Sequence, residues 1–374
     1  MPEKIVAKSK GLFSVSQAIN LATHDLMNFD KDLVTFGLGI NDPKRIFGTT
    51  SGLVETFGRK RVFDFPTSEN SMTGYAIGLA INGIPSITIH QRFEFFLLAL
   101  DQLVNNAAKW YFMFGSQTPV PIVIRLVVGK GWGQGPTHSQ SLHSWLAHVP
   151  GLKVVMPHDP QSAYDLLIDS ARDPNPVIYI EHRWIHEQVG TLVRRQMSSS
   201  QQSGLSAKCR KEFQGHPQIT IVSFSYLSSR VKTLYESLQI LKIGFEHLTI
   251  ETIQPYALQS IKESVKKSGR LLVLDFAART GSFAKEIVGE ISMSQDSGLI
   301  CPAKILTYPD SIEPTSHHST KNLYYDDSEI FRTILTLLDK DLDNPEIQSL
   351  CNEISNRLNL TPHDVPNIYF KGPF

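Results

Sequence analysis

The sequence predicts an α/β protein in which two consecutive units each combine strands and helices. Short apolar runs rich in Val and Ile alternate with longer stretches that carry apolar residues at helical spacing. After about residue 190 a polar, serine-rich stretch interrupts this alternation, which then resumes. The chain has 374 residues, of which 41% are hydrophobic, so it is long enough for two or three domains with buried cores.

The first series of strands predicts a parallel sheet flanked by helices, because its runs are apolar throughout. Strands are expected at 33–40, 84–90, 121–128, 153–157 and 176–181. Between them, residues 93–115 and 159–173 have the apolar spacing of helices, and Asp159 stands where an N-terminal cap is expected. These elements predict one α/β domain over residues 1–190.

A second, smaller α/β domain is expected after a linker. Residues 191–217 are polar, rich in serine and basic side chains, and have no sustained period, which is typical of a linker. Strand-like runs return at 218–225, 245–253, 270–276 and 303–309. They predict a domain over 218–340. The remaining segment, 341–374, is expected to be a C-terminal extension with one amphipathic helix and a proline-rich, aromatic end.

The charge balance and the cysteines argue against several classes of function. With 36 basic and 36 acidic side chains and no long block of one sign, the chain lacks the electrostatic footprint of a protein that binds nucleic acid or an anionic membrane. The three cysteines lack the paired spacing of a disulfide framework or a zinc site. The first residues have no apolar signal core, and no run approaches the roughly 18 apolar residues of a membrane-spanning helix. We therefore expect a cytoplasmic protein.

One acidic side chain, Glu69, stands out in the stretch FPTSENSMTG, residues 65–74. The helix expected after it is poor in bulk, with small residues at Gly74, Ala76, Gly78, Ala80 and Gly83. Such a helix allows another backbone or a flat ligand to approach closely. Taken alone, Glu69 has a simpler interpretation as an exposed or helix-capping acid. Its sequence context has to decide between the two.

That context is a set of motifs in one register. They are RVFDFPTSE (61–69), ALDQLVNNAAKWYF (99–112), HSQSLHSWLAHVPGLKVV (138–155) and RDPNPVIYIE (172–181). As a set they resemble the beta subunit of the decarboxylating component of 2-oxoacid dehydrogenase complexes, over roughly residues 12–335. The resemblance implies a pyrimidine-binding thiamine-diphosphate fold domain followed by a transketolase C-terminal-like domain. It also implies thiamine diphosphate as the cofactor.

Three residues match functional positions of that family. Glu69 matches the glutamate that hydrogen-bonds a ring nitrogen of the aminopyrimidine and so helps the cofactor to lose its thiazolium proton. Phe95 matches the aromatic residue that packs on the aminopyrimidine. His138 matches the active-site histidine, which can steady the carboxylate of a 2-oxoacid or assist transfer of the acyl group. By themselves, Phe95 would be interpreted as a core residue and His138 as an ordinary loop histidine.

The diphosphate half of such a cofactor site is missing from this sequence. The chain contains no Gly-Asp-Gly followed by a distant Asn, the pattern that holds magnesium and the diphosphate in this superfamily. The resemblance therefore implies a separate alpha subunit that supplies the magnesium site, in an alpha2-beta2 heterotetramer. A lipoyl acyltransferase is the further partner that a 2-oxoacid dehydrogenase would imply.

The resemblance also suggests a structural potassium ion. The main chain at Ile122, together with Ser170, Asp173 and Asn175, matches the place where many beta subunits hold potassium through carbonyl oxygens. The simpler interpretation of the Asp-Pro-Asn segment is a turn without a metal.

The sequence departs from the family in two places. Gly37-Leu38-Gly39 stands where Gly-Glu-Asp is common, and Lys130 and Trp132 stand in a loop that is usually plainer. These departures suggest a specialised enzyme whose substrate the sequence does not identify. We expect a catalytic beta subunit that decarboxylates a 2-oxoacid and passes the acyl or aldehyde unit to lipoamide or another acceptor. Two alternatives stay open, a transketolase-like carboligase subunit and a non-catalytic assembly or regulatory subunit.

Overall fold

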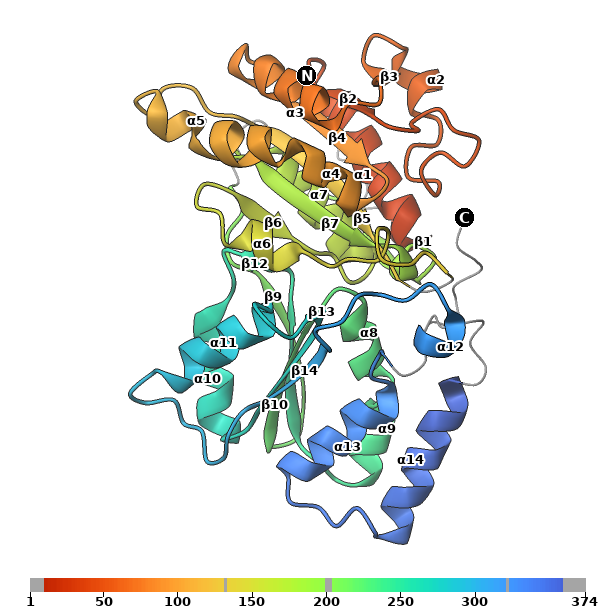
Figure 1. Ribbon diagram of the computed structural model, residues 1–374, viewed down its shortest axis with the longest axis vertical. Helices are drawn as coiled ribbons and strands as arrows, with labels where there is room; N and C mark the ends of the chain where they lie inside the picture. The colour runs from red at the N-terminus through yellow and green to blue at the C-terminus, as the bar shows by residue number, and fades with distance from the viewer. Residues whose placement is uncertain (1–9, 131–132, 199–203, 321–322, 359–374) are drawn as a thin grey trace, which may run out of the picture. The chain divides into compact units, whose positions relative to one another are not determined.

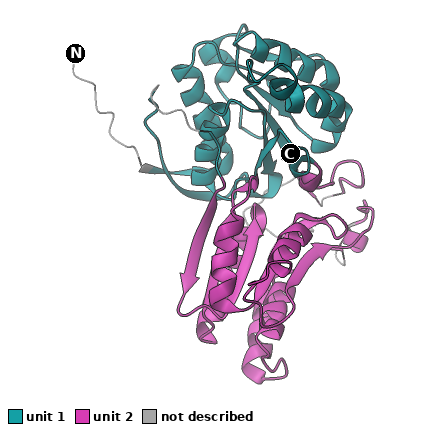
Figure 2. Ribbon diagram, turned by 90° about the vertical axis from the view of Figure 1, so that its left-hand side faces the viewer, with its two compact units in different colours: residues 1–128, 146–206, 374 teal, residues 129–145, 207–373 magenta. Residues whose placement is uncertain are grey.

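The computed structural model describes residues 10–130, 133–198, 204–320 and 323–358. It divides into two compact units, which Figure 2 draws in teal and magenta. Unit 1 is formed by the described parts of 1–128 and 146–206, and unit 2 by the described parts of 129–145 and 207–373. Each unit is an α/β structure with its own sheet. Within the described ranges, no helix is both long and apolar enough to cross a membrane.

Unit 1 contains a parallel sheet whose strands run in the order β6-β7-β5-β4-β2-β3. Its strands are β2 (Val34–Gly37), β3 (Val62–Asp64), β4 (Ser86–His90), β5 (Ile122–Val128), β6 (Lys153–Val155) and β7 (Val177–His182). Strands β4, β5 and β7 are buried along their whole length, which is why their sequences read as continuous apolar runs. A separate antiparallel pair joins β1 (Lys10–Ser14) to β8 (Val189–Val193).

Helices cover both faces of this sheet (Figure 1). On one face, α1 (Val15–Phe29) packs against α7 (Pro160–Ala171), and on the other face α3 (Glu69–Ile81) and α4 (Phe93–Phe96) contact β4 and β5. The short helix α2 (Leu53–Phe57) contacts β3. The predicted cap of α7 is confirmed, because the Asp159 carboxylate accepts a hydrogen bond from the main-chain N–H of Ser162 at 2.7 Å.

The helix expected over 93–115 is not continuous. It consists of α4, a 3-10 helix η1 (Leu97–Ala99), a π-helix η2 (Gln102–Ala107) and α5 (Ala108–Met113). Along the π-helix, Asn105 donates to Asp101 and Asn106 donates to Gln102 through their side chains. The spacing of apolar residues shows which face of a helix is buried, but it does not distinguish α, 3-10 and π turns. The sequence therefore could not predict that this helix changes type along its length.

A buried ion pair lies in the core of unit 1. Arg125 on β5 donates two hydrogen bonds to one carboxylate oxygen of Glu181 on β7, at 2.9 and 2.7 Å. His186 lies 3.1 Å from the other carboxylate oxygen. Burial works against ionisation of Glu181, but Arg125 and His186 outweigh it and hold the pKa of Glu181 below its usual value. The Arg125–Glu181 pair links the neighbouring strands β5 and β7, and both side chains are fully buried.

Unit 2 contains a second sheet with the strand order β14-β13-β10-β11-β9, parallel except for β9. Its strands are β9 (Cys209–Gln214), β10 (Ile219–Phe224), β11 (Phe245–Ile250), β13 (Leu271–Ala278) and β14 (Lys304–Tyr308). The short strand β12 (Thr252–Gln254) follows β11 in the sequence and is not part of this sheet. Its helices are α6 (His143–Ala147), α8 (Tyr226–Lys232), α9 (Tyr235–Ile240), α10 (Leu258–Ser268), α11 (Phe283–Ser292), α12 (His317–Thr320), α13 (Asp327–Leu337) and α14 (Pro345–Leu358). The last of them, α14, packs against α13.

The segment 191–217, expected to be a linker, contributes strand residues at both ends. Its start belongs to β8, and β9 lies near its end as an edge strand that pairs antiparallel with β11. The side chains of β9 are partly or fully exposed, and charged residues are common on such edges. A polar edge strand has no apolar run, and this is why the sequence does not reveal it.

Candidate functional site

Glu69 is the first residue of α3 and is buried, with 6% of its surface exposed. The residue before it, Ser68, occupies the cap position, but its hydroxyl bonds to that of Ser71 and does not cap the helix. Within the described ranges, no group donates a hydrogen bond to the Glu69 carboxylate. Glu69 is therefore neither an exposed acid nor a capping acid. It is a largely buried residue whose carboxylate can accept a hydrogen bond from a ligand.

The helix α3 that begins at Glu69 has an open face along its small residues. A Cβ atom at Gly78 would meet nothing within 4 Å, and one at Gly74 would meet only the end of the Gln102 side chain, at 3.6 Å. Tyr75, on the same helix, is 45% exposed. This face is accessible to another chain or to a flat molecule.

Phe95 lies on α4, which packs against α3. Its two aromatic neighbours, Phe93 and Phe96, are fully buried, whereas Phe95 is 40% exposed. A core role for Phe95 is therefore excluded. The ring is available to stack on a ligand in the same unit that holds Glu69.

His138 belongs to unit 2, although its sequence position lies between two strands of unit 1. The loop over 133–142 has no regular structure, and α6 follows it. His138 is half-buried, and its Nδ1 lies 2.9 Å from the hydroxyl of Thr137. The structure thus places Glu69 and Phe95 on two helices of unit 1 that contact each other, and it places His138 in unit 2.

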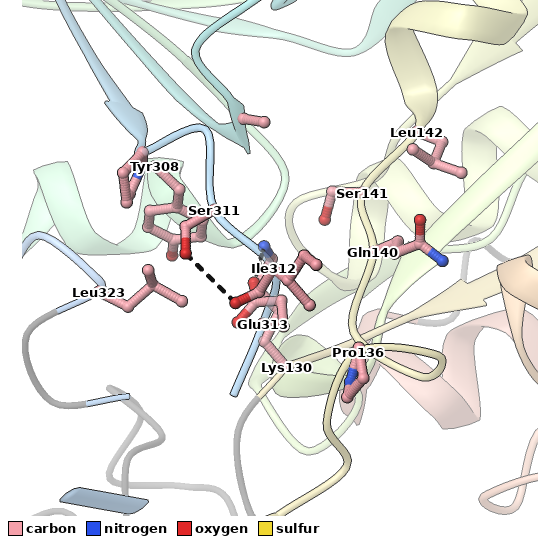
Figure 3. Close-up of a pocket in the computed structure, with 12 residues that line it drawn as sticks. Lys130, Pro136, Gln140, Ser141, Leu142, Tyr308, Ser311, Ile312, Glu313 and Leu323 are labelled. Carbon is pink, nitrogen blue, oxygen red and sulfur yellow. Dashed lines mark hydrogen bonds and ion pairs between the residues drawn. The ribbon is translucent and has the colours of Figure 1, made fainter. Parts of the chain in front are cut away.

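Unit 2 contains a pocket of about 210 Å³ beside the loop that carries His138 (Figure 3). One wall comes from this loop, with Pro136, Gln140, Ser141 and Leu142, and the other comes from the segment after β14, with Pro309, Ser311, Ile312 and Glu313. The hydroxyl of Ser141 is buried and has no hydrogen-bond partner among the described residues. Two residue pairs, Lys130 with Glu313 and His143 with Asp275, also join the loop and its ends to the rest of unit 2.

Both ion pairs are buried. Lys130 Nζ lies 2.5 Å from Glu313 Oε1, and His143 Nε2 lies 3.1 Å from Asp275 Oδ1. Burial works against ionisation of Asp275, but His143 and the N–H groups of Ala277 and Ala284 outweigh it and lower its pKa. The partners are 183 and 132 residues apart in the sequence, so no local pattern could have identified them. Trp132, the other unusual residue of this loop, lies outside the described residues.

Packing favours glycine at both Gly37, which the family shares, and Gly39, where the sequence departs from it. A Cβ atom on Gly37 would lie 2.4 Å from the carbonyl oxygen of Ile89 on the neighbouring strand. Gly39 has a positive φ, and a Cβ atom there would lie 2.5 Å from the carboxylate of Asp42. The Gln91 amide nitrogen is closer still, at 1.9 Å, so Gln91 and Asp42 together fill the space that a side chain at position 39 would occupy. The Gln91 amide donates a hydrogen bond of 3.2 Å to the Asp42 carboxylate.

The side chains expected near potassium are already engaged. Asp173 accepts hydrogen bonds from Lys153 at 2.6 Å, from the N–H of Leu205 at 2.5 Å and from Asn175. The Ser170 hydroxyl donates to a helix carbonyl at 2.6 Å. These side chains do not fit a cation, and only main-chain carbonyls remain as candidate ligands. In the part of the chain that the structure describes, no group of three or more His, Cys, Asp or Glu side chains could hold a metal ion.

Two family models match the chain. The model described as "Transketolase, pyrimidine binding domain" matches residues 13–186, and "Transketolase, C-terminal domain" matches residues 207–330. Among solved structures, one titled "Split gene transketolase, inactive beta4 tetramer" is similar with a TM-score of 0.67 over 88% of this chain and 99% of that chain. Its sequence identity is 14%, so this likeness concerns the fold alone. Together these matches confirm the predicted fold class.

Curated relatives of the chain are beta subunits. The pyruvate dehydrogenase E1 component subunit beta-2, mitochondrial, of Oryza sativa subsp. japonica is 31% identical over 75% of this chain and 73% of its own. The 2-oxoisovalerate dehydrogenase subunit beta 2, mitochondrial, of Arabidopsis thaliana is 34% identical over 76% and 77%. The pyruvate dehydrogenase E1 component subunit beta of Staphylococcus epidermidis is 29% identical over 80% and 90%. The resemblance inferred from the motifs is confirmed.

Proposed function

Because the chain belongs to the family of beta subunits of pyruvate and 2-oxoisovalerate dehydrogenases, we propose that it works with an alpha subunit in a heteromeric, thiamine diphosphate-dependent 2-oxoacid dehydrogenase. The complex would decarboxylate a 2-oxoacid and pass the acyl or aldehyde unit to lipoamide or another acceptor. Magnesium would be held by the alpha subunit, because this chain lacks the Gly-Asp-Gly pattern.

We also propose a cytoplasmic location. All three cysteines are free thiols, which is consistent with a reducing compartment.

The observation that carries this proposal is Glu69, a largely buried residue whose carboxylate accepts no hydrogen bond from the described residues. A carboxylate with little access to water gains from a ligand that supplies a donor. The ring nitrogen of an aminopyrimidine, when it carries a proton, is such a donor. Phe95 offers an exposed ring face on the helix that packs against α3. The carboxylate acceptor and the aromatic surface therefore fit the pyrimidine half of thiamine diphosphate.

The chemistry proposed for the residues of this chain is limited and specific. When bound, thiamine diphosphate would supply the carbon nucleophile that decarboxylation of a 2-oxoacid needs. Glu69 would hold a proton between its carboxylate and the pyrimidine ring nitrogen, where low solvent access strengthens the hydrogen bond. Phe95 would fix the plane of the ring. His138 would bind the carboxylate of the 2-oxoacid or exchange a proton during transfer to the acceptor.

Exposed apolar side chains around the same elements support the proposed alpha–beta interface. Leu98, Tyr111, Phe112, Met113 and Phe114 are between 45% and 85% exposed on η1, on α5 and directly after it. Exposed apolar patches of this kind mark sites of protein–protein contact. An alpha2-beta2 heterotetramer would cover them, and a lipoyl acyltransferase would be a further partner. If potassium takes part, it would be held by main-chain carbonyls near Asp173.

The test is calorimetric titration with thiamine diphosphate and magnesium. The isolated chain is expected to bind weakly or not at all, because it lacks the diphosphate ligands. After co-expression with a chain that carries the Gly-Asp-Gly pattern, the complex is expected to bind tightly and to release carbon dioxide from a 2-oxoacid. The matched control is the same complex with Glu69→Gln. Tight, magnesium-dependent binding by the isolated chain would contradict the shared site, and absence of decarboxylation by a loaded complex would contradict the activity.

A further inference from the structure

The loop that carries His138 is placed by unit 2 and not by the strands that flank it in the sequence. Residues 129–145 leave β5 of unit 1, and the chain rejoins unit 1 from residue 146 onward, before β6. Between these points residues 133–142 form no helix or strand. A loop without regular structure keeps one conformation only if specific contacts hold it. Three contacts hold this loop.

The first contact lies at the start of the loop. Lys130 pairs with Glu313, and Tyr324 donates a hydrogen bond to the second oxygen of the same carboxylate at 2.7 Å. The Lys130 ammonium also lies 4.3 Å from the centre of the Tyr308 ring. Lys130 is 3% exposed and Glu313 is 8% exposed. Figure 3 shows Lys130 and Glu313 side by side at one end of the pocket.

The second contact lies at the end of the loop. His143, the first residue of α6, pairs with Asp275 on β13. The imidazole also contacts the rings of Phe224 and Phe276, with centroid distances of 5.2 and 5.1 Å. The Asp275 carboxylate accepts further hydrogen bonds from the main-chain N–H groups of Ala277 and Ala284. An imidazole held by a buried carboxylate and two rings has one orientation.

A third contact lies between the two ion pairs. Gly135 has a positive φ, and a Cβ atom there would lie 2.5 Å from the hydroxyl of Thr315. The carbonyl of Gly135 accepts a hydrogen bond from the N–H of His138. The turn that carries His138 therefore packs closely against Thr315, in the segment that also contains Glu313.

We infer that the Lys130–Glu313 and His143–Asp275 pairs form a clamp that fixes the His138 loop to unit 2, and that these four are positioning residues for His138. Both ends of the loop are tied to unit 2, so fewer conformations remain open to the residues between them. Removal of one partner would take away one of these buried contacts and release that end of the loop. This inference rests on the role proposed for His138, and it adds how the histidine is held.

The experiment uses the full chain in complex with its alpha subunit and the variant Glu313→Gln. Hydrogen–deuterium exchange of peptides covering 133–142 should rise at least about tenfold, because the loop then opens more often. Peptides that cover β5 in unit 1 should exchange as in the wild type. Tyr324→Phe, which removes one hydrogen bond to Glu313, should act in the same direction but more weakly, and it keeps the test usable if Glu313→Gln does not fold.

Turnover supplies the second readout. Glu313→Gln should slow turnover about as much as His138→Ala does, and like His138→Ala it should spare proton exchange at the thiazolium carbon of the bound cofactor. The separate variant Lys130→Arg keeps the cation beside Glu313, so it should retain most of the wild-type turnover and most of the protection from exchange. A general loss of structure in Glu313→Gln would instead impair every step, including proton exchange at the thiazolium carbon.

The matched control is Asp327→Asn, which breaks the buried Arg230–Asp327 pair of the same unit without touching the loop. It should lower the stability of unit 2 and leave exchange over 133–142 unchanged. Wild-type exchange in both Glu313→Gln and Tyr324→Phe would overturn the clamp. Faster exchange with undiminished turnover would overturn the positioning role. The exchange measurement needs no turnover, so an inactive wild-type complex would contradict the proposed function separately.

Discussion

Glu69 and His138 are held in place by different means. Glu69 begins a regular helix that buries Met72, Ala76 and Ile77 against the sheet of unit 1. His138 lies on an irregular loop of unit 2 that depends on buried ion pairs with distant parts of the chain. The position of Glu69 depends on many apolar contacts, each of which contributes a small part of the stabilising free energy. The position of His138 depends on a few polar contacts, so the loss of one of them should have a large effect. The two site residues should therefore respond differently to substitution.

The largest expected effect separates the two residues by the step that they serve. Glu69→Gln should leave folding and assembly nearly intact and lower the rate of proton exchange at the thiazolium carbon by about a hundred- to ten-thousand-fold, the usual range for a general acid–base group. His138→Ala should spare this exchange and slow a later step. NMR after acid quench of the reconstituted complex in deuterated buffer measures the exchange. A wild-type exchange rate in Glu69→Gln would end the proposed role of Glu69.

The next effect compares two neighbouring aromatic residues in unit 1. Phe96→Ala removes a fully buried ring and should lower the free energy of unfolding by about 3–5 kcal/mol. Phe95→Ala removes a partly exposed ring and should cost much less stability, but it should weaken binding of thiamine diphosphate to the complex by about tenfold. Urea unfolding and calorimetry measure the two quantities. An equal loss of stability in both variants would show that Phe95 acts as a core residue and would contradict its role in cofactor binding.

A third test compares buried histidines of the two units. His143 has a carboxylate partner, whereas neither nitrogen of His90 on β4 has a partner among the described residues. Burial lowers the pKa of His90 from 6.5 to about 3. The unfolded chain therefore binds a proton that the folded chain excludes, so His90 costs stability as the pH falls from 6.5 toward 3, by roughly 1.4 kcal/mol per pH unit.

His90→Phe should remove this part of the pH dependence, because phenylalanine does not titrate and can pack against Phe96 as the imidazole does. Above pH 6.5 the variant should be at least as stable as the wild type, since two unpaired ring nitrogens disappear. Urea unfolding over this pH range is the measurement. An unchanged slope in the variant would show that other groups cause the acid sensitivity.

The smallest expected effect concerns the departure from the family at Gly39. Gly39→Asp restores an acidic residue that is common there, but it places a side chain at positive φ in the space held by Asp42. We expect a loss of about 1 kcal/mol and no gain in turnover, because the Asp42 carboxylate already occupies this region. The double variant Gly39→Asp with Asp42→Gly should recover only part of the stability, because the Gln91 amide and the positive φ at position 39 remain. A marked gain in turnover in the single variant would instead show that the missing acid limits activity.

Local sequence patterns were sufficient for most of unit 1. Buried parallel strands require apolar residues on both faces, so β4, β5 and β7 could be identified from composition alone. The cap at Asp159 needs only a side chain and an N–H three residues later. The motif around Glu69 identified the family because its members are adjacent in the chain. In each case the determining contacts join residues close in sequence or repeat with a fixed period.

Only the tertiary structure decided where the His138 loop belongs and which residues hold it. The loop is flanked by strands of unit 1, and its partners Glu313 and Asp275 are 183 and 132 residues away from Lys130 and His143. The exposure of Phe95, in a run of apolar residues that reads as core, was likewise fixed by how α4 packs. A periodic pattern records only which face of an element is apolar, whereas an ion pair between distant residues leaves no period. Its partners can be identified only after the fold has brought them together.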